Sequence, residues 1–229
     1  MPMTSFSFKP YVAIIGDLID SRRLQDRKTV QEKLSNVLND TNKIYSSDLC
    51  SKFMITLGDE FQGLMQKGNH VIDILEKIER DIYPIRVRFG IGVGEITTEI
   101  DSSSPFGADG SAYYNARYMI DALKTVKKKK MKPMLNIGIK IENHDSMTAL
   151  INSIFSQNAI IKSKWTTRQR EIVYAYVKCG GTQDAAGKML GINQSTVQKA
   201  LQASGYYTSQ YALRSVTDVL VQIMENYCV

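Results

Sequence analysis

The sequence predicts an α/β protein, an α+β sandwich of the ferredoxin-like group, followed by an all-α helix-turn-helix domain. Between residues 11 and 141, apolar runs of strand length alternate with amphipathic segments in the order β, α, β, β, α, β, α, β, which is typical of sandwiches with a mainly antiparallel sheet. From Trp165 onwards, short helical segments are separated by glycines. The length of 229 residues accommodates two units, which we place at residues 1–158 and 159–229.

Hydrophobic periodicity assigns the elements of the first unit. Strands are expected at residues 11–15, 51–57, 61–65, 85–96 and 135–141, and helices at residues 28–45, 71–82, 111–126 and 146–155. Gly58 and two acids separate the second and third strands, so a hairpin is expected there. Gly90, Gly92 and Gly94 alternate in the fourth strand and leave one face bare, which lets another backbone or a ligand come close. Residues 127–132 form a basic loop that is solvated or meets phosphates.

The second unit shows the capping and breaking signals of successive helices. These signals are Thr166 or Thr167 before the first helix, Gly180 and Gly181 after it, Thr182 before the second, Gly191 after it, and Asn193 and Gly205 around the third. Residues 211–227 carry apolar side chains on one face and predict a further helix for packing or dimerisation.

Composition and charge narrow the class of protein. With 43% hydrophobic and 23% charged residues, the chain is expected to fold throughout. Its three cysteines, Cys50, Cys179 and Cys228, fit neither a disulfide framework nor a CxxC metal site. No membrane span or secretory signal is apparent, so a cytoplasmic protein without a membrane partner is expected. Residues 162–217 include eight Lys or Arg but only two acids, Glu171 and Asp184, and this excess of positive charge indicates a polyanion partner.

Two acids follow the predicted strands closely. Asp17 ends the first strand and Asp59 stands at the hairpin tip, so they would be neighbours if those strands pair in the centre of the sheet. Two such carboxylates can hold Mg²⁺ together with substrate phosphates. Asp also stabilises turns and strand ends through hydrogen bonds to its own backbone. The residues alone leave both interpretations open.

The motifs around these acids carry a resemblance. GDLIDSR beside LGDEF, then VRFGIGVGE and DGSAYYNAR, resembles the catalytic domain of class III nucleotidyl cyclases and the related GGDEF diguanylate cyclase domain over residues 11–141. The resemblance implies a nucleotidyl cyclase-type sandwich in which Asp17 with Asp59, or with Glu60, binds Mg²⁺ or Mn²⁺ on a nucleoside triphosphate. The nucleotide-binding residues that it implies are Leu18 and Ile19 through their main chain, Gly58, and Arg117, which would also be catalytic.

The sequence departs from the cyclase pattern at two positions. Ile55 stands where adenine-selecting cyclases carry Lys, and Tyr113 stands where they carry an Asn four residues before Arg117. These departures favour a site used for binding over one used for turnover. The first glycine of GGDEF is also replaced, by Leu57. The chain as a whole is more similar to the SatD-like family of small bacterial proteins, whose GDLxxSR, GDEFQ and DGxAYYxAR signatures it carries.

The second unit resembles the helix-turn-helix of sigma-factor region four and related regulators. Ala186, the turn glycine Gly191 five residues later and Val197 six residues beyond have the spacing of this motif, whose second helix enters the major groove. A helical protein-interaction module is the alternative. The candidates for reading bases are Gln194, Ser195 and Gln198, with Thr196 able to contact bases or phosphates, and the candidates for phosphate contacts are Lys199, Arg168, Arg170 and Lys188.

Three functional hypotheses follow. The first is a cytoplasmic transcription regulator that binds double-stranded DNA, with a cyclase-like domain that binds a nucleotide and metal or mediates homodimer formation. The alternative is a metal-dependent nucleotidyl cyclase, or a related nucleotide-processing enzyme, that uses the helix-turn-helix for targeting. In the third, the cyclase-like domain is an inactive, degenerate scaffold that only dimerises the DNA-binding unit.

Overall fold

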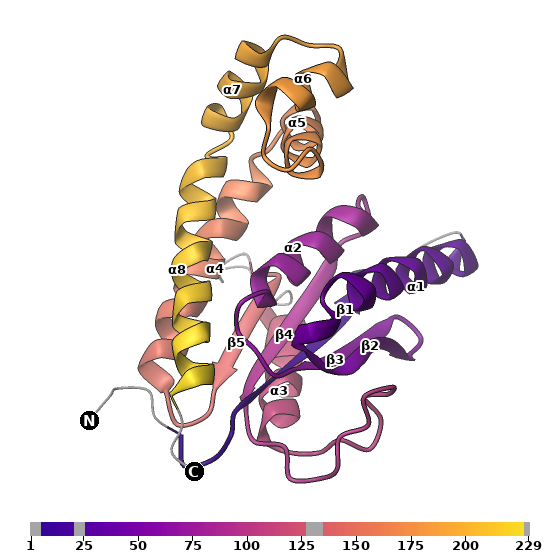
Figure 1. Ribbon diagram of the computed structural model, residues 1–229, viewed down its shortest axis with the longest axis vertical. Helices are drawn as coiled ribbons and strands as arrows, with labels where there is room; N and C mark the ends of the chain where they lie inside the picture. The colour runs from indigo at the N-terminus through magenta and orange to yellow at the C-terminus, as the bar shows by residue number, and fades with distance from the viewer. Residues whose placement is uncertain (1–5, 21–25, 127–134, 227–229) are drawn as a thin grey trace.

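The computed structural model describes residues 6–20, 26–126 and 135–226 (Figure 1), so the basic loop expected at residues 127–132 lies outside the described residues. The strands are β1 (Tyr11–Leu18), β2 (Leu49–Leu57), β3 (Glu60–Met65), β4 (Val87–Gly94) and β5 (Ile137–Ile141). The helices are α1 (Arg27–Ile44), the short 3-10 helix η2 (Ser46–Asp48), α2 (Val71–Ile82), α3 (Ser111–Val126), α4 (Asp145–Ser163), α5 (Thr167–Lys178), α6 (Gln183–Leu190), α7 (Gln194–Ala203) and α8 (Tyr206–Glu225). Within these ranges, no helix is both long and apolar enough to cross a membrane.

The five strands form one sheet in the order β2-β3-β1-β4-β5. β1 lies between β3 and β4 and is antiparallel to both, while β4 and β5 are parallel and joined through α3. The order of strands and helices along the chain and the mainly antiparallel pairing match the sandwich that the sequence predicts. The hairpin between β2 and β3 is also confirmed, and its turn residue Gly58 has φ +63, a left-handed conformation that favours glycine.

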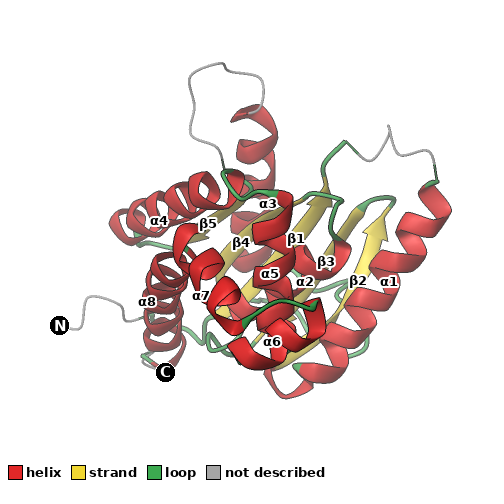
Figure 2. Ribbon diagram, turned by 90° about the horizontal axis from the view of Figure 1, so that it is seen from above, coloured by secondary structure: helices red, strands yellow, loops and turns green. Residues whose placement is uncertain are grey.

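Helices cover both faces of the sheet (Figure 2). On one face, the apolar side chains of α1, α2, α4 and α8 form a single core cluster with Val12, Ile14 and Phe89 of the sheet. On the other face, α3 packs against Ala13 and Ile15 in a smaller cluster. The C-terminal helix α8 is therefore part of the main core, which agrees with the packing role expected for residues 211–227.

The alternating glycines of β4 allow α3 to lie directly on the strand. A Cβ at Gly92 would be 1.9 Å from the carbonyl oxygen of Ala112, and a Cβ at Gly90 would be 2.3 Å from that of Ala116. Of the two occupants that the bare face allowed, a backbone and a ligand, the structure places the backbone of α3 there.

Both edges of the sheet are closed by an asparagine from a helix. Asn42 of α1 accepts a hydrogen bond from the Phe53 N–H (2.7 Å) and donates one to the Phe53 carbonyl (2.9 Å). Asn152 of α4 bonds both main-chain groups of Ile139 in the same way, at 2.9 and 2.8 Å. Edge strands expose unpaired N–H and C=O groups, so these two amides satisfy part of both edges.

Helices α5, α6 and α7 form a three-helix unit at the far end of the molecule, and α4 and α8 connect it to the sheet (Figure 1). The sequence predicts that a polar linker follows the helix at residues 146–155. The structure instead continues α4 without a break to Ser163, because Asn158 and Lys162 on this stretch find buried partners. The unit boundary expected at residues 158 and 159 therefore falls inside a helix.

Candidate ligand site and candidate nucleic-acid interface

The predicted carboxylates meet at one end of the central strands. Asp17 of β1 pairs in register with Glu60 of β3. The main-chain carbonyl of Asp59, in the hairpin turn, accepts a hydrogen bond from the Leu18 N–H at 3.1 Å. The pairing of β1 with β3 thus brings Asp17, Asp59 and Glu60 together, which is the condition under which the sequence predicts Asp17 and Asp59 to be neighbours.

Basic side chains surround two of these acids. The Asp17 side chain, only 10% exposed, forms ion pairs with Arg88 of β4 and with Lys124 of α3, and the Lys124 Nζ is 3.1 Å from its Oδ1. Glu60 accepts two hydrogen bonds of 2.6 Å from Arg117 of α3. These hydrogen bonds raise the pKa of Arg117 above its ordinary value. Three cations therefore neutralise two carboxylates.

This donor set does not fit a metal centre in the observed arrangement. Mg²⁺ and Mn²⁺ are held by carboxylates whose negative charge is available to the metal, whereas the charges of Asp17 and Glu60 are already balanced by Arg88, Lys124 and Arg117. Over the described ranges, no group of three or more His, Cys, Asp or Glu side chains is arranged to hold a metal ion. We therefore derive no metal-dependent step for this site.

The amides expected to face phosphate are already bonded. Leu18 N–H donates to Asp59, and Ile19 N–H donates to the Arg86 carbonyl at 2.8 Å. The Gly58 carbonyl accepts a hydrogen bond from the Gln31 Nε2 at 2.8 Å, while the space around its Cα is open. Of the nucleotide-binding residues expected from the sequence, Leu18 is buried, Ile19 and Arg117 are partly exposed, and Gly58 is exposed.

Helix α3 supplies no amide beside Arg117. Tyr113, which stands where the cyclase pattern has Asn, is 8% exposed, and within the described residues its hydroxyl has no hydrogen-bond partner. Burial raises the pKa of Tyr113, and the nearby Cys50 raises it further. The neighbouring Asn115 is buried and donates to the Val93 carbonyl at 3.1 Å, away from the site. The site of Arg117 therefore has no amide side chain at the position where the cyclase pattern has Asn.

Sequence reasoning missed the two cations paired with Asp17. Arg88 carried a usable signal, because a charged residue inside a strand predicted to be buried needs a partner of opposite charge. Lys124 carried a weaker one. It lies two turns after Arg117 on the same helix, so the two cations project from one side of α3 toward the acids.

The three-helix unit has its own apolar cluster. The residues buried in it are Ile172, Val173, Ala175, Ala186, Val197 and Leu201. Of the two caps that the sequence allows, Thr166 and Thr167, the structure has Thr166, which forms a capping box with Gln169 at the start of α5. Gly191 ends α6 in the left-handed conformation, and α7 begins directly after Asn193.

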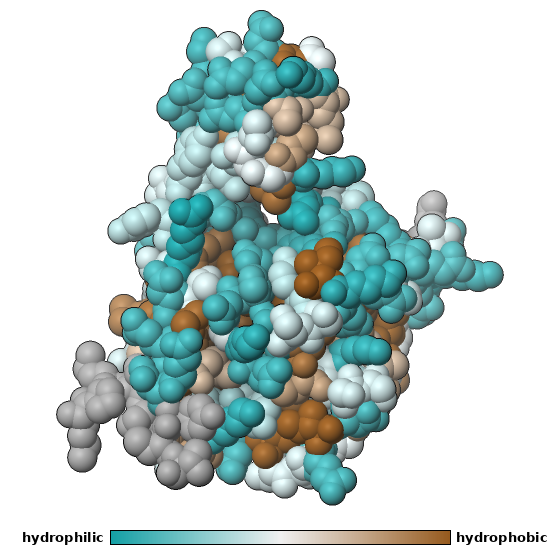
Figure 3. All heavy atoms as spheres, viewed as in Figure 1, coloured by the Kyte–Doolittle hydropathy of each residue, from teal (hydrophilic) through white to brown (hydrophobic). Residues whose placement is uncertain are grey.

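Most of the side chains expected to contact DNA are exposed on this unit. They are Gln194, Ser195, Thr196, Gln198 and Lys199 on α7, Arg168 on α5 and Lys188 on α6. Arg168 forms an ion pair with Glu171 at 2.9 Å, and Lys188 forms one with Asp184 at 2.7 Å. Because these pairs are exposed, they are weak and can be exchanged for phosphate contacts. The outer end of the unit is mostly hydrophilic (Figure 3).

Arg170 is the exception. Its guanidinium donates to the Lys162 carbonyl (3.0 Å) and to the Tyr174 hydroxyl (3.2 Å). It also lies over the rings of Tyr83 and Trp165, 5.2 and 5.3 Å from their centroids. A guanidinium held in this way does not reach a DNA phosphate, so the role expected for Arg170 from the sequence is wrong in this conformation. Arg170 instead attaches α5 to α4 and to the end of α2.

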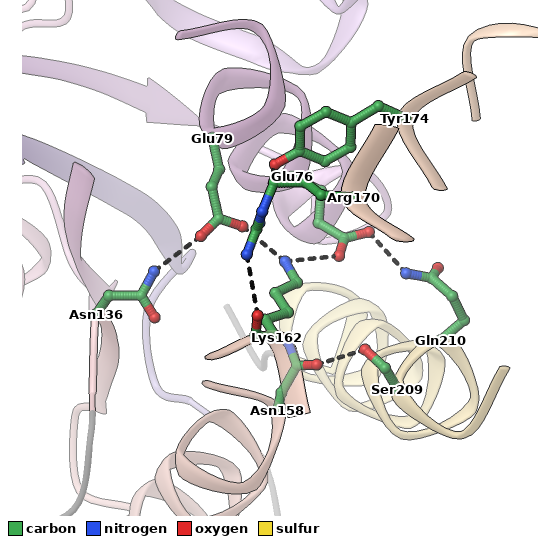
Figure 4. Close-up of polar contacts among 9 residues, drawn as sticks. All are labelled: Glu76, Glu79, Asn136, Asn158, Lys162, Arg170, Tyr174, Ser209 and Gln210. Carbon is green, nitrogen blue, oxygen red and sulfur yellow. Dashed lines mark hydrogen bonds and ion pairs between the residues drawn. The ribbon is translucent and has the colours of Figure 1, made fainter. Parts of the chain in front are cut away.

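A polar network next to Arg170 joins α4 and α8 to α2 (Figure 4). Lys162 of α4 lies between Glu76 and Glu79 of α2, with Nζ–O distances of 3.1 and 2.6 Å. Asn136 donates to Glu79 at 3.0 Å, and Gln210 of α8 donates to Glu76 at 2.9 Å. Burial opposes the charge on Lys162, but the two glutamates outweigh burial and raise its pKa. The adjoining cavity of about 30 Å³ has room for roughly one water molecule.

Comparison with solved structures gives distant likenesses. The catalytic core of a rhodopsin-guanylyl cyclase with converted specificity, in complex with ATPαS, is 14% identical with a TM-score of 0.37, over 49% of this chain and 71% of that chain. A bacterial light-regulated adenylyl cyclase is 12% identical with a TM-score of 0.41, over 57% and 74% of the two chains. A regulator of polyketide synthase expression from Bifidobacterium adolescentis is 11% identical with a TM-score of 0.30, over 94% and 86%. Likenesses of this strength carry no conclusion about activity.

A search of the curated proteins found no match. Membership of a family is nevertheless clear from the sequence comparison. The model of the SatD family matches residues 11–218, a span that includes the candidate site at the strand ends and the three-helix unit. This chain belongs to the SatD family.

Proposed function

We propose that this protein is a sequence-specific DNA-binding regulator that places α7 in the major groove of double-stranded DNA. The observation that best supports the proposal is the division of α7 into two faces. Val197 and Leu201 are buried in the three-helix cluster, while residues 194–196, Gln198 and Lys199 are exposed. A recognition helix needs this division, because its neighbours hold one face while the other reaches base edges.

The turn before α7 supports the same proposal. Gly191 has φ +64, and the Ile192 N–H donates to the Gly187 carbonyl at 2.9 Å, which closes the end of α6. A Cβ at Gly187 would be 2.7 Å from the Ile192 carbonyl oxygen, so a larger residue would push the turn away. The geometry of this turn fixes the angle between α6 and α7.

The exposed side chains divide into two roles. Gln194, Ser195 and Gln198 are positioned on the first two turns of α7 to meet base edges, and a glutamine amide can pair bidentately with adenine. Thr196 and Lys199 on α7, with Arg168 and Lys188 on the flanking helices, are placed to contact phosphates, which position the protein without reading sequence.

Selection of duplexes from a random-sequence DNA library by the full-length protein tests the proposal. We expect one motif to be enriched, with an affinity that falls steeply as salt rises, because phosphate contacts release counterions. The double variant Gln194→Ala, Gln198→Ala should lose the preference for that motif. Gln222→Ala, an exposed glutamine on α8 far along the chain, is the matched control. Unchanged selectivity in the double variant would show that α7 is not the reading helix.

We further propose that the α/β unit, residues 1–158, binds nucleotide phosphate or mediates homodimer formation, and that residues 159–229 carry the DNA-binding function. Arg117 and Lys124 support phosphate binding. Both side chains are partly exposed, and their carboxylate partners, Glu60 and Asp17, are neighbours on β3 and β1. A nucleotide that binds should raise the melting temperature of the parent protein, and should raise it less in Arg117→Ala. Light scattering of the purified protein gives its mass and tests the dimer separately.

A metal-dependent nucleotidyl cyclase or related nucleotide-processing enzyme is the second candidate function. The pairing of Asp17 with Glu60 favours it, since neighbouring carboxylates are what a divalent cation requires. This activity requires that the ion pairs to Arg88, Lys124 and Arg117 open first. Incubation with each nucleoside triphosphate and Mg²⁺ or Mn²⁺ decides the matter. If the parent protein binds a nucleotide measurably but forms no product, the enzyme hypothesis is rejected and nucleotide binding without turnover remains.

A further inference from the structure

Helix α4 covers the β5 edge of the sheet and presents its opposite face to solvent (Figure 2). Asn152 bonds to the edge strand, and Phe155 is buried in the main core. On the outer face, Leu150 is 68% exposed and Ile160 is 43% exposed. Spacings of three and four residues place the outer residues in one line opposite Phe155. This line, the α4 stripe, consists of the exposed residues Ser146, Leu150, Ser153, Gln157, Ile160 and Lys164.

The α4 stripe carries no charge before its last residue. Residues 146–161 include no Asp, Glu, Lys, Arg or His, although 23% of the whole chain is charged. Protein surfaces typically carry charges of both signs, whereas the central parts of protein interfaces are depleted of them. The Ser153 hydroxyl donates to the Ala149 carbonyl of its own helix at 2.9 Å. A partner can therefore cover the middle of the stripe without burying a charge or an unpaired hydroxyl proton. The same lack of basic residues makes DNA an unsuitable partner for this face.

The α4 stripe is symmetric about Phe155. Leu150 and Ile160 lie five residues before and after it, and Ser153 and Gln157 lie two residues before and after it. In a two-fold dimer whose helices pack antiparallel, each residue meets the one at the same distance on the other side of the centre. Leu150 of one copy then meets Ile160 of the other at both ends of the contact. Between these two apolar contacts, Ser153 meets Gln157, and a hydroxyl and an amide can bond each other.

The ends of α4 have opposite charges. The exposed Asp145 is its first residue, and the exposed Lys164 follows its last. Antiparallel contact brings Asp145 of one copy near Lys164 of the other. A parallel two-fold pair would bring like charges together at both ends, which is unfavourable. The charge pattern therefore favours a second copy of this chain in the antiparallel orientation.

We propose that the α4 stripe is a homodimer interface, packed antiparallel against the same stripe of a second copy. This inference rests on the homodimer formation proposed above and goes further in naming the face and its orientation. The two three-helix units then lie at opposite ends of the paired helices, because each unit follows the C-terminal end of its own α4. A single pair of helices covers less than the roughly 800 Å² per partner of a standard interface, so the dimer should dissociate on dilution.

The experiment measures the mass of the full-length protein by sedimentation equilibrium over a range of concentrations. The parent protein should pass from monomer to dimer as its concentration rises. Leu150→Glu and Ile160→Lys each place a charge against an apolar side chain at both ends of the contact. Each variant alone should therefore weaken the dimer by about tenfold or more.

Mixing the two single variants tests the orientation. In an antiparallel heterodimer, the carboxylate introduced at position 150 faces the ammonium introduced at position 160, and the other contact keeps the original leucine and isoleucine. The mixture should therefore recover dimers that neither variant forms alone. In a parallel pair, each introduced charge faces an unchanged apolar residue, so mixing would restore nothing.

Ile44→Lys is the matched control for Ile160→Lys. It makes the same substitution at an isoleucine that is 62% exposed on α1, and it should leave the monomer–dimer equilibrium unchanged. Thermal unfolding establishes that each variant is folded before its mass is measured. Both stripe positions are exposed, so the variants should unfold close to the temperature of the parent protein.

Three results would overturn the inference, and they are distinguishable. A parent protein that stays monomeric at every concentration rejects homodimer formation itself, and this interface with it. A parent protein that dimerises, with unchanged affinity in both single variants, keeps the homodimer but places its interface on another face. If both variants dissociate and their mixture stays monomeric, the antiparallel packing is wrong.

Discussion

At the scale of single residues, two side chains of the same type can have different roles because they have different surroundings. Arg168 and Arg170 lie two positions apart on α5, and the sequence gives both the same expected role. On a helix, residues two positions apart point in different directions. Arg168 therefore faces solvent, whereas Arg170 turns inward over Tyr83 and Trp165. A count of basic residues cannot make this distinction, because it depends on what packs against the helix.

The variant Arg170→Ala is expected to lower the free energy of unfolding without changing the electrostatic contribution to DNA binding. It removes two hydrogen bonds and the ring contacts, which together contribute about 1–3 kcal/mol. Guanidinium-induced unfolding measures this loss. The salt dependence of DNA binding should keep its slope, whereas Lys199→Ala should reduce that slope by about 1. A reduced slope in Arg170→Ala would return this residue to the DNA interface.

At the scale of elements, the contact between α3 and β4 determines the geometry of the candidate site. Arg117 and Lys124 reach Glu60 and Asp17 only because α3 lies close against the sheet. Glycines in β4 make that approach possible, as the carbonyl of Ala112 occupies the space where a Gly92 side chain would be. The sequence predicts this close approach from the alternation of glycines, but it cannot choose between a backbone and a ligand as the occupant.

Gly92→Ala should therefore destabilise the protein by more than Gly58→Ala. At Gly92 the added methyl overlaps main-chain atoms, and such overpacking typically costs about 1–3 kcal/mol or more. At Gly58 nothing lies within 4 Å, and the cost is the strain of φ +63, about 1 kcal/mol. Denaturant unfolding of both variants gives the two values. Equal losses would indicate that α3 can shift away from β4 at little cost.

At the scale of the whole molecule, the order of elements and the hairpin follow from the sequence because both depend on local periodicity and turn residues. The adjacency of Asp17 and Glu60 follows as well, once β1 is placed in the centre of the sheet. The partners of these acids do not follow, because Arg88 and Lys124 are set by strand register and helix rotation. The length of α4 was not predicted either. From the sequence, Lys162 resembles a polar linker residue, and only the structure shows that it pairs with Glu76 and Glu79 of α2.

This buried network should make the stability of the molecule depend on pH in a defined way. Burial alone would raise the pKa of Glu79, but Lys162 outweighs it and holds that pKa below the ordinary value of 4.5. A carboxyl whose pKa is lowered on folding contributes its full stability above 4.5 and loses it as pH falls through the folded value. Lys162 shows the opposite case. Its raised pKa keeps its contribution complete below 10.5, so a plateau between these limits is expected.

Replacement of Lys162 tests whether the network holds the molecule together. Lys162→Met leaves Glu76 and Glu79, whose side chains are 22% and 21% exposed, without the lysine that pairs with them, and removal of one partner from a fully buried pair, an upper bound here, typically costs about 3–5 kcal/mol. The triple variant that adds Glu76→Gln and Glu79→Gln removes the unpaired charges and should recover much of this loss. Unfolding free energies between pH 3 and pH 8, measured by denaturant titration, should fall below about pH 4.5 in the parent and change less in the triple variant. A parent and a Lys162→Met variant of equal stability at pH 7 would show that α4 and α8 are held to the sheet by their apolar contacts alone.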